Sequence, residues 1–160
     1  AGGLGLARRR PPVRQGGFAT AGIRRDRLLA ALPAGHPLAA REELSVADLR
    51  DEEFVAHAGH GRSVMSSILA AACADAGFVP NVRHEVTETS TLVTLVAAGL
   101  GVAIVPAPTA ALDIAGVDYR PLTPATLGVD LFFSAPATTE NPLIDNVIAT
   151  LRDLEFDSPR

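Results

Sequence analysis

Two stretches of this chain place hydroxyl side chains at the expected start of a helix, a combination suited to binding an anion. The first is Arg62–Ser63, which follows a loop with two glycines and precedes an apolar stripe at helical spacing. The free N–H groups and the positive dipole end of a helix N-terminus favour a negative charge. The Arg62 guanidinium and the Ser63 hydroxyl would add charge-assisted hydrogen bonds. The alternative is that Ser63 only caps the helix and that Arg62 is solvated.

The second stretch is Thr87–Thr91, TETST, which also joins an expected strand to an expected helix. Its hydroxyl groups allow the same two interpretations, capping of the helix or contact with an anion. Two helix starts of this kind in one small α/β domain raise the case for a single shared anion site.

Other kinds of site find less support. His57, His60 and His84 lack the close spacing of a metal site, and no cysteine or carboxylate completes a ligand set, so we favour surface or hydrogen-bonded histidines. The single cysteine, Cys73, lies on an apolar helical stripe and is expected to be a buried thiol. No nucleophile elbow is present, and GLG at 99–101 follows an expected helix rather than a strand. We therefore expect no enzyme activity, no cofactor and no metal.

Hydrophobic periodicity predicts the elements that position the two helix starts. Apolar residues at helical spacing run from Ser63 to about Ala76 and recur after Ser90, and a continuous apolar run at 102–105 predicts a buried strand. The other expectations are strands at 4–7, 53–57, 82–86, 117–121 and 128–133, a loop from 8 to about 20, an apolar run at 28–32, short helices at 45–49 and 109–112, and a last helix from Asn141–Pro142. Strands that alternate with helices indicate an α/β domain with a mostly parallel sheet, which binds ligands outside the carboxyl ends of its strands.

Composition indicates a globular domain that does not grip nucleic acid itself. The 160 residues are 48% hydrophobic and 20% charged, with a formal net charge of −4. Phosphate binding needs a basic face, and the one basic cluster, Arg8–Arg10 with Arg14, is either a nucleic-acid arm or a solvated loop beside a domain boundary. No apolar run approaches the ~18 residues of a membrane helix. The single cysteine excludes an internal disulfide and fits a reducing cytoplasm.

Four stretches in order resemble the effector-binding domain of LysR-type transcriptional regulators. They are DRLLAALPAGHPLA at 26–39, the helix from Ser63 through GFVPNVRHEVTE at 77–88, LVAAGLGVAIVP at 95–106, and GVDYRPL at 116–122. The final GVDLFFSAP and the helix after it fit the family's return strand and closing helix. The HEVTE segment is most similar to the subgroup that controls the catabolism of aromatic compounds.

The resemblance implies an α/β fold like a type 2 periplasmic binding protein, with two α/β subdomains joined by two crossover strands and the effector in the cleft between them. The crossings would lie near 29–33 and 120–128. Subdomain two would span 34–119, and subdomain one would combine 1–29 with 125–160. The N-terminal winged helix-turn-helix and the first part of subdomain one are absent from this chain, so subdomain one is incomplete. We expect the sequence to start partway into a longer protein.

The resemblance also implies site residues and partners. Carried over residue by residue, the effector contacts would come from Gly61, Arg62, Ser63, Pro106, Ala107, and Ala31 and Pro33 near the hinge, with Thr89 and Ser90 as further candidates. The effector would be a small anion, aromatic or dicarboxylic, whose binding shifts the arrangement of subdomains or protomers and so repositions a DNA-binding domain. We expect a cytoplasmic homodimer or homotetramer with no membrane partner. The alternatives are a periplasmic-type solute-binding protein and a small α/β enzyme.

Overall fold

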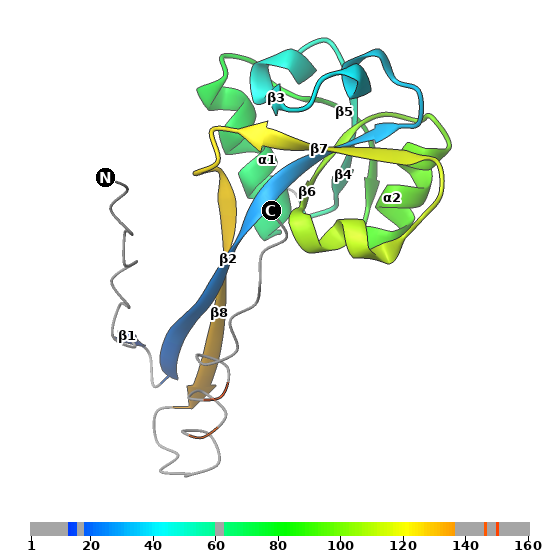
Figure 1. Cartoon of the computed structure of the whole chain (residues 1–160). Coiled ribbons are helices and arrows are strands. Elements are labelled where there is room, and N and C mark those ends of the chain that lie inside the picture. The colour runs from blue at the N-terminus through cyan, green and yellow to red at the C-terminus, as the bar shows by residue number, and fades with distance from the viewer. Residues whose placement is uncertain (1–12, 16–17, 60–62, 137–145, 147–149, 151–160) are drawn as a thin grey trace, which may run out of the picture. The chain divides into compact units, whose positions relative to one another are not determined.

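The sheet of this protein is built around one long strand that most of the other strands flank. The structure, a computed structural model, describes residues 13–15, 18–59, 63–136, 146 and 150. The chain forms two units, residues 1–26 with 130–160 and residues 27–129. The long strand, β2 (Phe18–Pro33), runs from the first unit into the second (Figure 1).

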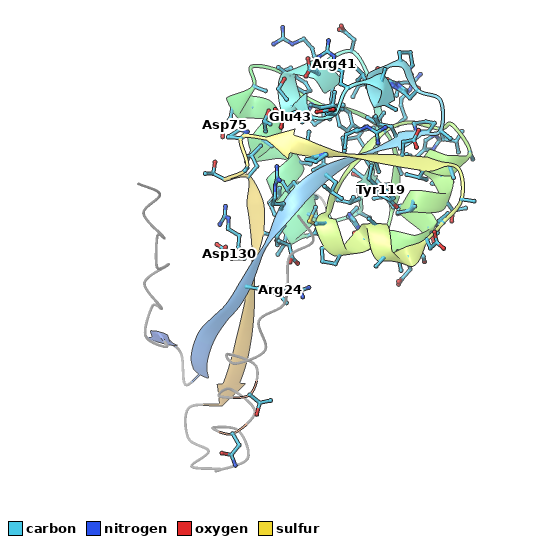
Figure 2. All side chains as sticks on the ribbon, viewed as in Figure 1. Arg24, Arg41, Glu43, Asp75, Tyr119 and Asp130 are labelled. Atoms are coloured by element: carbon cyan, nitrogen blue, oxygen red, sulfur yellow. The ribbon has the colours of Figure 1, made fainter. Side chains whose placement is uncertain are left out.

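The first unit contains β1 (Val13–Gln15), which pairs antiparallel with the start of β2, and most of β8 (Gly128–Pro136), which also pairs with β2. Arg25 of β2 lies 2.7 Å from Asp130 of β8 in an exposed ion pair, and Figure 2 labels Asp130 beside this strand pair. The expected loop as far as Thr20 is wrong, because Val13 pairs with Thr20 in a strand ladder. The arginine- and proline-rich residues before Val13 indicated a loop. The β1–β2 pairing depends on contact between two strands, which local composition does not show. The expected strand at 4–7 and the helix from Asn141–Pro142 lie outside the described residues.

The second unit holds the remaining elements in a βαβ order that matches the sequence expectation. They are η1 (Pro37–Ala40), β3 (Leu44–Ser45), η2 (Val46–Leu49), β4 (Glu53–His57), α1 (Val64–Asp75), β5 (Asn81–Val86), α2 (Thr89–Ala97), β6 (Ala103–Pro106), η3 (Ala107–Leu112) and β7 (Val117–Thr123). Ser63 caps α1 and Ser45 precedes η2, as the sequence predicts.

These strands join in the order β5-β4-β6-β2-β7-β3. The β4–β5 and β3–β7 pairs are parallel, whereas β2 is antiparallel to both β6 and β7. A parallel bridge between Phe54 and Val102 connects β4 to β6, with hydrogen bonds from Val102 N to Glu53 O (2.8 Å) and from Val55 N to Val102 O (2.9 Å). β2 therefore runs opposite to the other five strands, and the arrangement is mixed, with parallel β4–β5 and β3–β7 pairs and antiparallel β2–β6 and β2–β7 pairs.

Successive residues of the central strands face two different cores. Phe54 and Ala56 of β4 belong to the cluster that includes Leu69, Ala72 and Cys73 of α1. Val55, between them, belongs to the cluster that includes Leu92, Val93 and Val96 of α2. Because side chains alternate across a strand, α1 and α2 cover opposite faces of the sheet, as Figure 1 shows. The continuous apolar run of β6 follows from burial on both faces.

Gly101 makes the β4–β6 connection possible. It has φ +152, and a Cβ at this position would lie 2.6 Å from the carbonyl oxygen of Glu53. That carbonyl accepts the Val102 N–H that starts the β6 ladder. Only a residue without a side chain fits between the two strands at this point.

We expect Gly101→Ala to lower the free energy of unfolding by about 3 kcal/mol, since it adds backbone strain of ~1–3 kcal/mol and displaces ladder hydrogen bonds worth ~1 kcal/mol each. Gly99→Ala is the matched control, because Gly99 has φ +80 but no atom within 4 Å of an added Cβ. It should cost only the left-handed backbone penalty of about 1–2 kcal/mol. Urea unfolding of both variants measures the difference, and equal losses would contradict this role of Gly101.

Cys73 is fully buried, as expected, and burial raises the pKa of its thiol to about 11. At pH 8 only about one thiol in a thousand is then ionised. We expect a disulfide reagent such as dithiobis(nitrobenzoate) to react at least about a hundredfold more slowly with the folded protein than with the protein in urea. Similar rates in the two conditions would show that Cys73 is accessible.

Candidate functional site

The carboxyl ends of three parallel strands meet at one edge of the second unit's sheet. β4 ends at His57, β5 at Val86 and β6 at Pro106, and α1, α2 and η3 begin after these strands. Because the strands are parallel neighbours, the starts of the helices that follow them gather at this edge. We call it the carboxyl edge.

The segment after β4 touches the starts of both long helices. His57 Nε2 lies 3.1 Å from the Thr89 Oγ1 at the start of α2. Two residues later, an added Cβ at Gly59, which has φ +148, would lie 2.9 Å from both the N and the Cβ of Ser63 at the start of α1. The starts of α1 and α2, both predicted from the sequence, therefore lie next to the same three residues, 57–59.

The two helix starts differ in how their free N–H groups are satisfied. At α1, the half-buried Ser63 accepts a hydrogen bond from the Ser66 N–H with its Oγ (3.3 Å). At α2, the N-cap residue is Glu88, and no side chain caps the helix. The first N–H groups of α2 therefore lack the N-cap acceptor that α1 has, and they are available to water or to a ligand. Thr89 is half-buried and Ser90 is exposed at this start.

His57 is a half-buried imidazole beside these groups. Burial lowers the pKa of His57 below its ordinary value of 6.5. The side chain is therefore mainly neutral at pH 7, when no negative charge is bound nearby.

A shallow hollow of about 170 Å³ lies next to the carboxyl edge, between α1 and strands β4 and β5. Its lining is mostly apolar and consists of Ala56, His57, Ser66, Leu69, Ala70, Pro80, Val82 and Glu85. An apolar cavity of ~150 Å³ is known to hold one benzene ring, so a space of this size accommodates a small aromatic group.

The structure brings most of the described candidate residues to the carboxyl edge. Ser63, Thr89, Ser90, Pro106 and Ala107 all lie where a strand ends or a helix begins. Pro106 and Ala107 are half-buried there. Gly61 and Arg62 lie outside the described residues.

Ala31 and Pro33 lie apart from this group. β2 is antiparallel to β6, so Leu28 pairs with Pro106 at the carboxyl edge while Ala31 pairs with Ala103, one strand length away. Pro33 pairs with Val117 at the beginning of β7, on the opposite edge of the sheet. Ala31 is also fully buried in the cluster that α2 covers. The β2 residue that reaches the carboxyl edge is Leu28, which the sequence analysis did not select.

Sequence reasoning also did not select His57 as a site residue. It expected surface or hydrogen-bonded histidines, and His57 does form a hydrogen bond, but to a residue 32 positions away. The available signal was its place at the end of a strand, directly before a glycine-containing loop. Among the described residues, no group of three His, Cys, Asp or Glu side chains is arranged to hold a metal ion. Within the same residues, no helix has the length and apolar character needed to cross a membrane.

Known proteins similar to this chain are transcriptional regulators. Residues 2–155 match the family described as the LysR substrate binding domain. The regulator AlsR of Bacillus subtilis is 33% identical over 118 residues, which cover 74% of this chain and 39% of AlsR. TtuA of Agrobacterium vitis is 41% identical over 92 residues, which cover 58% of this chain and 30% of TtuA. The chain thus spans well under half the length of these curated relatives.

A solved structure shows the same fold. The BenM effector-binding domain with its effector benzoate superimposes with a TM-score of 0.79 at 25% identity, covering 89% of this chain and 65% of that one. The fold is therefore the type 2 periplasmic-binding-protein-like α/β fold that the sequence resemblance implied, and the similar curated proteins are regulators rather than enzymes. With a family match over nearly its whole length, this chain belongs to the LysR substrate-binding domain family.

Proposed function

We propose that this domain senses a small organic anion at the carboxyl edge of the second unit and passes the signal to a DNA-binding domain of the same protein. The observation that carries this proposal is the uncapped start of α2, which lies within hydrogen-bond reach of His57 and shares residues 57–59 with the start of α1. N–H groups without a side-chain acceptor at the positive end of a helix provide the attraction for a carboxylate.

The binding residues we propose are Ser63, Thr89 and Ser90, with Pro106 and Ala107 beside them. The Ser63 hydroxyl accepts from the Ser66 N–H and keeps its own proton for a ligand oxygen. Thr89 and Ser90 are the first two residues of α2 and offer both hydroxyl and backbone N–H donors. A carboxylate with two oxygens can accept from both helix starts at once.

An aromatic or dicarboxylic acid is the ligand class we propose. BenM, to which this chain is similar, has been solved with benzoate, an aromatic carboxylate. The mostly apolar hollow beside the carboxyl edge offers about 170 Å³ for a ring or a short carbon chain. A carboxylate at the helix starts and an apolar body against this hollow would use both features.

We propose the effect of ligand binding on DNA binding, and the oligomeric state, from the similar proteins of the family. AlsR and TtuA are named as HTH-type transcriptional regulators, so we infer that ligand binding here controls DNA binding by a homodimer or homotetramer in the cytoplasm. Ligand binding would act by favouring one arrangement of subdomains or protomers. The periplasmic-type solute-binding alternative is not favoured, because these similar proteins are regulators.

Benzoate at a hundred times its Kd should stabilise the protein by about 2.7 kcal/mol, which raises the melting temperature by several degrees. Thermal denaturation with benzoate, cis,cis-muconate and, as an uncharged control, benzamide tests this. Stabilisation by the acids but not by benzamide supports an anion site. No stabilisation by any organic acid would contradict the proposed function.

Ser63→Ala and Thr89→Val should each weaken binding of the responding acid about tenfold, since each removes one hydrogen bond to a charged group. Calorimetric titration gives the Kd of each variant. Thr94→Val is the control, because Thr94 is exposed and its hydroxyl donates to the Ser90 carbonyl oxygen of its own helix (2.8 Å). Unchanged affinity in Ser63→Ala and Thr89→Val would place the site elsewhere.

A further inference from the structure

We propose that His57 is a positioning residue for the bound anion and makes its affinity depend on pH, by controlling whether the Thr89 hydroxyl can donate a hydrogen bond. This inference rests on the proposed function, because it assigns a regulatory role to a residue beside the proposed anion site. The juxtaposition that carries it is the 3.1 Å contact between His57 Nε2 and Thr89 Oγ1 at the uncapped start of α2.

The direction of this hydrogen bond depends on the imidazole proton. When Nε2 is bare, the Thr89 hydroxyl donates its only proton to the ring and has none left for a ligand. When Nε2 carries a proton, the ring donates to Oγ1, and the hydroxyl proton is free to point at an anion. The doubly protonated imidazolium always has the second arrangement and also adds a positive charge. Thr89 can therefore donate to an anion whenever Nε2 carries a proton, which is always so in the doubly protonated imidazolium.

Two acidic residues of neighbouring elements belong to the same part of the structure. Glu85 of β5 lines the same hollow as His57, and Glu88 is the N-cap residue of α2. From α1, the residues that line this hollow are Ser66, Leu69 and Ala70, and all three are uncharged. Burial of the ring disfavours the protonated form and lowers the pKa of His57 in the ligand-free protein. The two acids repel an anion, so a compensating positive charge at His57 matters for binding.

The sign of the pH dependence follows from linkage. An anion bound at the start of α2 favours the imidazolium and raises the pKa of His57, so binding takes up protons. Affinity is lowest at high pH, rises as the pH falls through the raised pKa of the complex, and levels off below the lower pKa of the free protein. A rise of about one pKa unit on binding corresponds to a tenfold gain in affinity.

The test is the Kd of benzoate between about pH 8 and about pH 5.5, a range in which the carboxylate stays ionised. We expect affinity for the unsubstituted protein to rise about tenfold across this range. His57→Gln, which keeps hydrogen-bonding capacity but cannot become charged, should bind with a flat profile. His84→Gln is the matched control, because His84 is an exposed histidine on the neighbouring strand β5, and it should keep the full rise.

A second measurement follows the unsubstituted protein and uses His57→Gln only to assign the signal. The imidazole of His57, identified in the NMR spectrum by its loss in His57→Gln, should titrate about one pH unit higher when the protein is saturated with benzoate. A His57→Gln profile as steep as that of the unsubstituted protein, or an unchanged imidazole pKa on saturation, would overturn the inference and leave the anion site standing. Failure of benzoate to bind at any pH would instead overturn the proposed function, and this inference with it.

Discussion

The parallel connection between β4 and β6 determines where the functional elements of the second unit lie. Two backbone hydrogen bonds around Val102 join these strands, and Gly101 allows the backbones to approach there. This bridge joins the two-stranded β4–β5 sheet to the sheet that contains β6, β2, β7 and β3. It also aligns the ends of β4 and β6, so that the helices that follow both start at one edge.

The sequence predicts well those features that are encoded locally. Ser63 as a cap, Gly77 and Gly99 in left-handed conformations at helix ends, and the apolar run of β6 each depend on residues close together in the chain, and all are present. The start of β2 was not predictable in this way, because Val13 and Thr20 form strands only by pairing with each other. Local composition therefore indicated a loop.

The same distinction between local and long-range features applies to the candidate site. The helix starts at Ser63 and Thr89 could be selected because hydroxyl residues before an apolar stripe indicate a helix N-terminus. The role of His57 could not, since it arises from a contact across 32 residues that exists only once β4 and α2 are packed. The register of β2 could not be predicted either, and this register alone decides that Leu28, rather than Pro33, reaches the carboxyl edge.

In the proposed function, the start of α2 exchanges some stability for a capacity to bind. A Ser, Thr, Asp or Asn at the N-cap that accepts a backbone N–H typically adds ~1 kcal/mol, and Ser63 supplies such a bond for α1. Glu88 supplies none for α2, although Leu92, Val93 and Val96 anchor that helix firmly in the core. Because packing holds α2 in place, its first N–H groups can remain without a side-chain acceptor at little risk to the fold. An anion bound as we propose would act as the missing cap, so that ligand binding would also order this helix start.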